Sequence, residues 1–294
     1  MSVICAKYLP IVGWVIGKNR DRILKPTVRI RKSFRRNMER LYLWDEKTKY
    51  TEGLNEYGIA IVSAKCKVSR DSEEGFFATQ YDAEIDKKPR VYYSPEGFRI
   101  RKALFEKDIN EVVNKLIEYE VTGNTIIANK ERCFILEAAF IDSEIAGEQN
   151  YVHEVKELRQ SDTVVRTNHG VLLDWVGPSQ DNYDEYEQYL SSVSRYSKVS
   201  DNLWAVKSAS ELLDCLSIRD DENNPQLNPL ITDKRKSAMR TTGQIILIPS
   251  ERLLQYRNIW GTTLFDMEII NREDEKTFFE IISNKRLLSF KERY

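Results

Sequence analysis

Cys5 is the residue near the start of the chain whose side chain is best suited to act as a nucleophile. It lies in the apolar segment SVICAKYLP, which has the composition of a β-strand. A free thiol has a pKa of about 8.5, so a base is needed to ionise it at neutral pH. If Cys5 were the first residue of the mature chain, its own α-amine, with a pKa of about 7.7 to 8.0, could serve as that base. Sulfur and amine on one residue would then support acyl-transfer chemistry.

A second polar cluster follows one predicted hairpin later, in GKNRD at residues 17–21. In a regular strand Lys18 and Arg20 point to one face, while Asn19 and Asp21 point to the other. Both pairs reach one site only if the strand bends or ends there. Taken alone, the segment would be a strand end with solvated charges, but its distance from Cys5 favours a site.

The other cysteines and the two histidines give no metal-binding pattern. Cys66, Cys133 and Cys215 lie in apolar strand-like or helical segments and show no CxxC spacing, so we expect reduced core residues. No metal or organic cofactor is expected. His169 would allow a Cys–His dyad as an alternative. Because it follows Asn168 in a predicted strand, we expect it instead to pack or to line a pocket.

Five short motifs follow the near-terminal cysteine and carry a family resemblance. They are GKNRD (17–21), GLNEYGIAI (53–61), VTGNTIIANKERCFILEA (121–138), RTNH (166–169) and SSVSRY (191–196). In this order they resemble the N-terminal nucleophile (Ntn) cysteine hydrolases. The nearest branches are the choloylglycine hydrolase and penicillin V acylase group and the acyl-coenzyme A:6-aminopenicillanic acid acyltransferase-like group. The resemblance covers about 190 residues, and each motif alone is weak.

The resemblance implies a role for two residues near the start of the chain. Cys5 matches the nucleophile, whose α-amine is freed in the family by an aminopeptidase or by self-cleavage, so residues 1–4 would be a removed leader. Asp21 matches the aspartate that holds this amine in place, a role that suits a carboxylate acceptor.

Three further residues match the family's site. Asn168 corresponds to the asparagine that donates into the oxyanion hole. Arg195 corresponds to an arginine that braces the site and favours the thiolate by its charge. Lys18 stands where the bile-salt branch has arginine. The compact ammonium group of lysine cannot form the two parallel hydrogen bonds that a guanidinium group offers.

The order of predicted elements indicates an α+β protein. Strand-like segments precede an amphipathic helix over residues 100–119, a hairpin with its turn at 129–132 follows, and a second hairpin is predicted over 151–169. Helices are expected over 181–200 and 208–220, and strands over 242–270. This order favours a single layered domain over 1–294. The resemblance implies a four-layer αββα sandwich of two antiparallel sheets flanked by helices.

Charge and hydropathy limit the expected partners. The chain of 294 residues has 45 basic and 46 acidic residues, and no global field would attract nucleic acid or anionic lipid. The basic run at 28–40 favours a solvated or salt-bridged surface, with a polyanion site as the alternative. Since no apolar stretch reaches about 18 residues and no secretory signal is evident, we expect a soluble cytoplasmic protein with no membrane or nucleic-acid partner.

The function that the resemblance implies is cleavage of a linear amide through an acyl-cysteine intermediate, with water or another acceptor releasing the acyl group. The expected partner is a small-molecule acyl amide, and a homo-oligomer is compatible with the family. Two alternatives stay open: a non-catalytic homologue that binds a partner, and a peptidase acting in trans.

Overall fold

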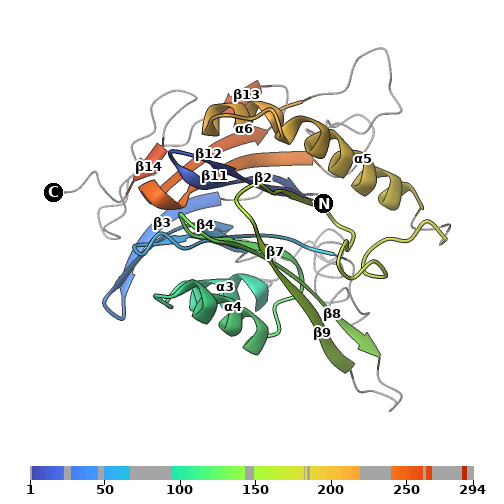
Figure 1. Ribbon diagram of the computed structural model, residues 1–294, viewed down its shortest axis with the longest axis horizontal. Helices are drawn as coiled ribbons and strands as arrows, with labels where there is room; N and C mark the ends of the chain where they lie inside the picture. The colour runs from blue at the N-terminus through green and yellow to red at the C-terminus, as the bar shows by residue number, and fades with distance from the viewer. Residues whose placement is uncertain are drawn as a thin grey trace, which may run out of the picture.

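The protein consists of two antiparallel β-sheets that face each other, with helices on both outer sides, in a computed structural model (Figure 1). The structure describes residues 2–22, 28–45, 50–66, 95–142, 149–181, 183, 186–218, 240–260, 263–266 and 287–289. The predicted α+β sandwich with four layers is therefore confirmed.

The first sheet contains both ends of the described chain. Its strand order is β10 (Thr163–Arg166), β1 (Ser2–Leu9), β2 (Gly13–Arg22), β11 (Arg240–Ile248), β12 (Leu253–Trp260) and β13 (Thr263–Asp266), with β14 (Leu287–Ser289) also paired to β12. Its outer face is covered by α5 (Tyr186–Leu203) and α6 (Ala209–Cys215).

The second sheet follows the chain order. It consists of β3 (Val28–Arg35), β4 (Met38–Asp45), β5 (Thr51–Asn55), β6 (Ala60–Ala64), β7 (Gly123–Ala128), β8 (Cys133–Asp142) and β9 (Gln149–Leu158). The helices α3 (Pro95–Ala103) and α4 (Ile109–Glu118) cover its outer face. Among the helices that the structure describes, none is long and apolar enough to cross a membrane.

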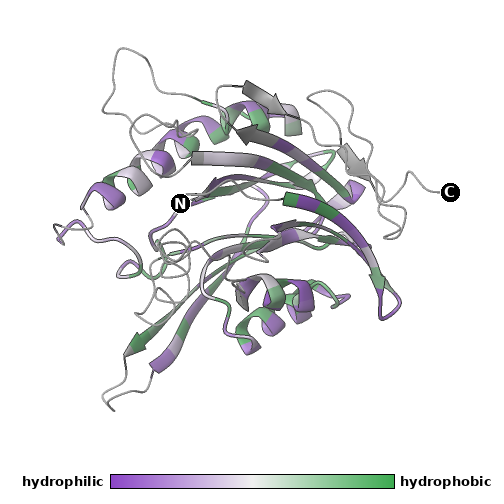
Figure 2. Ribbon diagram, turned by 180° about the vertical axis from the view of Figure 1, so that it is seen from behind, coloured by the Kyte–Doolittle hydropathy of each residue, from purple (hydrophilic) through white to green (hydrophobic). Residues whose placement is uncertain are grey.

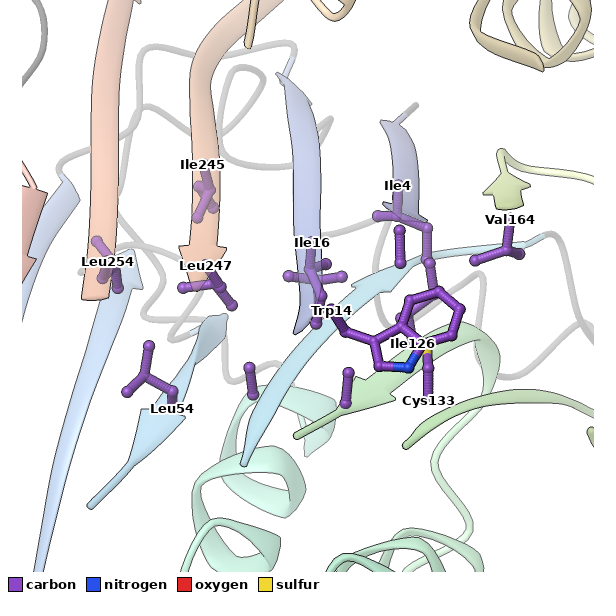
Figure 3. Packing of buried hydrophobic residues seen from close by; sticks show 14 of the residues in the cluster. Ile4, Trp14, Ile16, Leu54, Ile126, Cys133, Val164, Ile245, Leu247 and Leu254 are labelled. Carbon is purple, nitrogen blue, oxygen red and sulfur yellow. The ribbon is translucent and has the colours of Figure 1, made fainter. Parts of the chain in front are cut away.

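Apolar side chains fill the space between each pair of layers. Between the sheets, Ile4 and Ile16 of the first sheet lie above Leu54 and Ile126 of the second (Figure 3). The outer helices expose polar residues and bury an apolar stripe, and both kinds of residue colour these helices in Figure 2. In α4 the stripe is Ile109, Val112, Val113 and Leu116, at the spacing of one helical face.

The β1–β2 hairpin fixes the register that builds the candidate site. The backbone amide of Val12 bonds the Leu9 carbonyl in the turn, and Gly13 has a φ of 89°. At Gly13 a Cβ would lie 2.3 Å from the Lys130 carbonyl oxygen, so only glycine fits. From this turn the pairing runs to Ser2 opposite Arg20.

Several sequence-based predictions need correction. The helix predicted over 100–119 is two helices, because the Asp108 side chain accepts from the amides of Asn110 and Glu111 and starts α4. The second predicted hairpin is wrong, since β9 pairs with β8 and β10 with β1 in the other sheet. The basic run at 28–40 forms most of the β3–β4 hairpin. Two further features of the sequence, the strand-like VYYS at 91–94 and the polar segment over 219–236, lie outside the described residues.

Candidate active site at the start of strand β1

Alternation along β1 divides its side chains between two layers. Ile4 and Ala6 belong to the core between the sheets, whereas Val3 and Cys5 belong to the core beneath α5 and α6. Ser2 therefore shares the inter-sheet face with Ile4, and the Cys5 side chain points the other way.

The environment of Cys5 is apolar and closed. Cys5 has no solvent exposure, and a Cβ added at Gly17, its partner on β2, would lie 3.2 Å from the Cys5 sulfur and 2.7 Å from Leu216. Burial raises the pKa of the Cys5 thiol far above its ordinary value, with a further contribution from Cys215. This thiol stays protonated and has no contact with the polar groups of the site.

This geometry does not support Cys5 as the nucleophile, and that role stays a prediction. Release of its α-amine would require removal of residues 1–4, yet Ser2, Val3 and Ile4 are buried and are the first three of the eight residues of β1. Val3 and Ile4 each belong to one of the two apolar cores. Loss of these residues would shorten β1 and remove apolar side chains from both cores.

A polar cluster surrounds Ser2 instead. The backbone nitrogen of Ser2 donates to Asn168 Oδ1 over 2.9 Å, and the Ser2 carbonyl oxygen accepts from Arg195 Nη1 over 2.9 Å. Arg195 Nη2 donates to the same Asn168 Oδ1 over 3.0 Å. Three segments that are far apart in the sequence thus meet at one residue, through main-chain groups that any residue at position 2 would present.

Asp21 joins this cluster through Arg195. The Arg195 Nη1 atom lies 3.6 Å from Asp21 Oδ2, and the Thr241 hydroxyl donates to Asp21 Oδ1 over 2.7 Å. Both charged side chains are almost completely buried. Burial lowers the pKa of Arg195, while Asp21 opposes that shift. The ion pair holds a positive charge beside the main chain of Ser2.

Lys18 belongs to a different ionic cluster on the inter-sheet side. Its ammonium group contacts the carboxylate of Glu52 and donates to the Ser63 carbonyl oxygen over 2.5 Å. The guanidinium of Arg20 lies 3.4 Å from Glu52 and 4.0 Å from Asp45. The alternation of GKNRD is thus regular, with Lys18 and Arg20 on one face and Asp21 on the other. Of the two faces, the one with Asp21 is linked to Ser2, through Arg195.

Asn168 is fixed by contacts with helix α5 and with the residue that follows strand β6. Its backbone nitrogen donates to Ser192 Oγ over 3.0 Å, and its Nδ2 donates to the Lys65 carbonyl oxygen over 2.5 Å. Ser192 and Arg195 lie three residues apart on the buried face of α5. One helical turn therefore positions both the backbone and the side chain of Asn168.

His169 packs against α5, as expected from its place after Asn168. Its Nδ1 lies 2.8 Å from Ser192 Oγ and 3.0 Å from Thr167 Oγ1, and its ring has edge contacts with Tyr189 and Tyr196. Burial and the nearby Arg195 charge lower the pKa of His169. The histidine is part of the support for Asn168 and makes no contact with Cys5 in the described structure. Within the described residues, no group of three or more potential metal-ligating side chains occurs.

Comparison with known proteins gives structural matches only. No protein-family model and no curated protein matches the chain. Penicillin V acylase from Agrobacterium tumefaciens matches with a TM-score of 0.41 and 11% identity, covering 87% of this chain and 82% of that one. A variant of conjugated bile acid hydrolase from Clostridium perfringens matches with a TM-score of 0.38 and 9% identity, covering 87% of this chain and 89% of that one.

A second variant of the same bile acid hydrolase matches with a TM-score of 0.39 and 11% identity, covering 97% of this chain and all of that one. These neighbours belong to the superfamily that the sequence motifs resemble. Their similarity to this chain is too low to transfer an activity or a residue role.

Sequence reasoning missed Ser2, and a simple signal could have found it. In the β1–β2 hairpin the residue numbers of each paired couple add up to 22, for example Leu9 with Gly13 next to the turn. A turn predicted at residues 10–12 therefore places position 2, and not position 5, opposite Arg20 and next to Asp21. The prediction of Cys5 rests on its residue type, whereas the register pairs Cys5 with Gly17.

Proposed function

We propose that the protein is an amide hydrolase whose nucleophile is the Ser2 hydroxyl, with the α-amine of Ser2 as the base. The amine becomes available when the peptide bond between residues 1 and 2 is cleaved. One observation carries the proposal: Asn168 Oδ1 accepts from both the Ser2 nitrogen and Arg195, which in turn bonds the Ser2 carbonyl. A terminal amine at this position would have a fixed acceptor and a fixed direction.

The chemistry follows from the groups on this one residue. The amine takes the proton of the Ser2 hydroxyl, and Oγ attacks the carbonyl carbon of the amide. The protonated amine then gives its proton to the leaving nitrogen, and the C–N bond breaks to leave an acyl ester on Ser2. Water, deprotonated by the same amine, attacks this ester and releases the acid. A serine hydroxyl ionises far less readily than a thiol, so the mechanism depends strongly on this base.

Asn168 is the candidate donor to the oxyanion. Its side-chain nitrogen has two hydrogens, and the described structure uses one of them for the Lys65 carbonyl. The second hydrogen is then available to the oxygen of a tetrahedral intermediate. A fixed donor of this kind is worth roughly 3 to 4 kcal/mol of barrier height in acyl transfer.

Arg195 and Asp21 support the base. The buried positive charge of Arg195 disfavours a second positive charge on the amine and so keeps the amine able to accept a proton. Asp21 holds Arg195 in place across 3.6 Å. Lys18 serves the neighbouring ionic cluster with Glu52 rather than the nucleophile. The proposed substrate class is a small-molecule acyl amide, with water as the acceptor.

The test compares single substitutions at the two candidate nucleophiles. Purified protein is assayed on a panel of N-acyl p-nitroanilides, and its intact mass is measured in parallel. We expect the mass to lack residue 1, Ser2→Ala to abolish turnover, and Cys5→Ala to retain it. Ser2→Cys is the matched control, since it preserves a nucleophile on the same backbone. Turnover by Ser2→Ala equal to the unsubstituted protein would refute the proposal.

A further inference from the structure

Two buried polar side chains of the second sheet have no part in the chemistry described so far. Asn124 of β7 and Glu137 of β8 lie directly opposite each other in the antiparallel ladder, so their side chains share one face. Asn124 is fully buried and Glu137 is 2% exposed. Glu137 interrupts the apolar sequence of β8. Because a carboxylate is costly to bury without partners, the groups that it contacts indicate its role.

Glu137 holds the segment that carries Asn168 from both of its ends. Its Oε1 accepts from Arg166 Nε over 2.5 Å, and both side chains are buried. Its Oε2 accepts from three consecutive backbone amides, over 2.8, 2.7 and 3.1 Å, which are those of Val171, Leu172 and Leu173. Successive amides that point at one oxygen form a concave anion site. The protein supplies the anion itself, and the carboxylate ties residue 166 to residues 171–173.

Asn124 holds the two residues next to Asn168. Its Nδ2 donates to the carbonyl oxygens of Thr167 and His169, over 3.0 Å in each case. A side-chain amide nitrogen has two hydrogens, and these two carbonyls can use both. The Cys66 sulfur lies 3.1 Å from the same nitrogen. The peptide groups that follow Thr167 and His169 are therefore fixed, with Asn168 between them.

The rest of the segment folds back towards Asn168. The Gly170 amide donates to the Val176 carbonyl over 2.7 Å, and the Val176 amide donates to the Leu173 carbonyl over 2.9 Å. At Gly177, where φ is 101°, an added Cβ would lie 2.5 Å from the Asn168 carbonyl oxygen. The main chain of Asn168 thus has little room to move away from Asn124 and Glu137.

The exact place of the Asn168 side chain matters because it serves several partners at once. Its Oδ1 accepts from the Ser2 nitrogen and from Arg195, and its Nδ2 donates to the Lys65 carbonyl. The direction of the second Nδ2 hydrogen, the candidate donor to the oxyanion, follows from these three contacts. A shift of the main chain at Asn168 would alter all of them together.

We propose that Asn124 and Glu137 are positioning residues that act on catalysis through Asn168. This inference rests on the proposed function, because it concerns the aim of the Asn168 donor. Among the described residues, no hydrogen bond or ion pair joins either side chain to Ser2. A preorganised donor stabilises the transition state only when it is held in the productive direction. The second sheet would thereby control a site built mainly on the first.

The alternative is a network that only stabilises the fold. The two roles differ in one measurable respect. A residue that acts through Asn168 has no further effect on turnover once the Asn168 amide is removed. A residue that only stabilises the fold has the same effect whether or not that amide is present.

The test is a double-mutant cycle on kcat, with the N-acyl p-nitroanilide that the unsubstituted protein cleaves. Asn168→Ala should lower kcat about 100- to 1000-fold. Asn124→Asp keeps the shape of the side chain and removes both donors, so it should lower kcat about 10- to 100-fold with KM changed less than about threefold. Asn168→Ala/Asn124→Asp should match Asn168→Ala within about twofold.

Glu137→Gln is the second variant and carries the same cycle if Asn124→Asp does not fold. Glutamine keeps an oxygen for the three amides and loses the ion pair with Arg166, so kcat should fall about tenfold. The matched controls Asn150→Asp and Glu154→Gln make the same chemical changes at exposed positions of β9, and each should change kcat less than about twofold. Thermal unfolding sets an assay temperature at which every variant is folded.

Hydrogen exchange distinguishes failure of this inference from failure of the proposed function, because it needs no turnover. Mass spectrometry follows the peptides that cover residues 166–173, with peptides from β11 as the internal reference. In Glu137→Gln we expect the amides of residues 171–173 to exchange at least about tenfold faster, while β11 and the Glu154→Gln control stay unchanged.

Two results would overturn the positioning role itself. One is unchanged exchange at residues 171–173 in Glu137→Gln. The other is an equal loss of kcat from Asn124→Asp with and without the Asn168 amide. Full turnover by Ser2→Ala together with the expected exchange would refute the proposed function, and with it the catalytic part of this inference, but would still show that Glu137 anchors the segment.

Discussion

Substitution of Arg195 by methionine tests whether the buried ion pair organises the start of β1. Arg195 is 1% exposed and bonds the Ser2 carbonyl, Asn168 Oδ1 and the Ser191 carbonyl, with Asp21 at 3.6 Å. Methionine fills a similar volume without charge or donors. The Asp21 carboxylate then stays buried without its cation, which costs about 3 to 5 kcal/mol when one partner of a buried pair is removed.

A double-mutant cycle separates the interaction free energy of the Arg195–Asp21 pair from the other losses of stability. Asp21→Asn keeps an acceptor for the Thr241 hydroxyl and leaves Arg195 with its three carbonyl acceptors, so we expect a loss of about 1 to 3 kcal/mol. In Arg195→Met/Asp21→Asn the uncompensated carboxylate is gone. The double variant should therefore be more stable than the sum of the single losses, by about 1 to 3 kcal/mol.

The assay is urea unfolding followed by tryptophan fluorescence. With an m-value of about 3 kcal/mol/M, the loss predicted for Arg195→Met lowers the unfolding midpoint by about 1 to 1.7 M. Arg159→Met, at an exposed position, is the matched control and should stay within about 0.5 kcal/mol. A loss below about 1 kcal/mol for Arg195→Met, or single losses that add without coupling, would refute the reasoning.

Three further predictions concern the residues around this site. Cys5 should react with a thiol reagent only after unfolding, because burial raises the pKa of its thiol and closes access; rapid labelling of the native protein at Cys5 would contradict this. Gly17→Ala should destabilise the protein by about 1 to 3 kcal/mol in thermal unfolding, since the new Cβ would lie 2.7 Å from Leu216; an unchanged melting temperature would show that α6 moves freely. His169 has a pKa below its ordinary 6.5 in the folded state, so the unfolded chain binds more protons and stability falls as pH drops below about 6.5. His169→Gln should flatten this part of the stability–pH curve, and an unchanged slope would exclude His169 as its source.

The fold was predictable where local patterns agree with the final packing. The helix predicted over 208–220 begins with Ser208 as its cap, and the turn predicted at 129–132 is present, because capping and turn chemistry act over a few residues. Asp108 is likewise the cap at the start of α4. The sequence analysis missed it, because the apolar residues on both sides continue the spacing of one helix.

Pairing between distant strands was harder to predict. β9 and β10 are close in sequence and resemble a hairpin, yet they belong to opposite sheets, because β10 pairs with β1 across more than 150 residues. Local patterns contain no information on such a partner.

The candidate site was predictable in part. Asp21, Asn168 and Arg195 were named from motifs, and the structure brings them together, although their catalytic roles stay a proposal. Cys5 was predicted from its chemistry, and its side chain lies on the face of β1 beneath α5 and α6. Strand alternation decides which side chains share a layer, so a candidate three residues away along the strand lies on the other face.

Mapping of an acyl adduct tests the central claim most directly. The protein is treated with an activated acyl ester, digested and examined by mass spectrometry, with hydroxylamine treatment to distinguish an ester on Ser2 Oγ from an amide on its nitrogen. We predict a hydroxylamine-sensitive adduct on a peptide that begins at Ser2. An adduct on Cys5, or a peptide that still carries Met1 in a turnover-competent protein, would contradict the account.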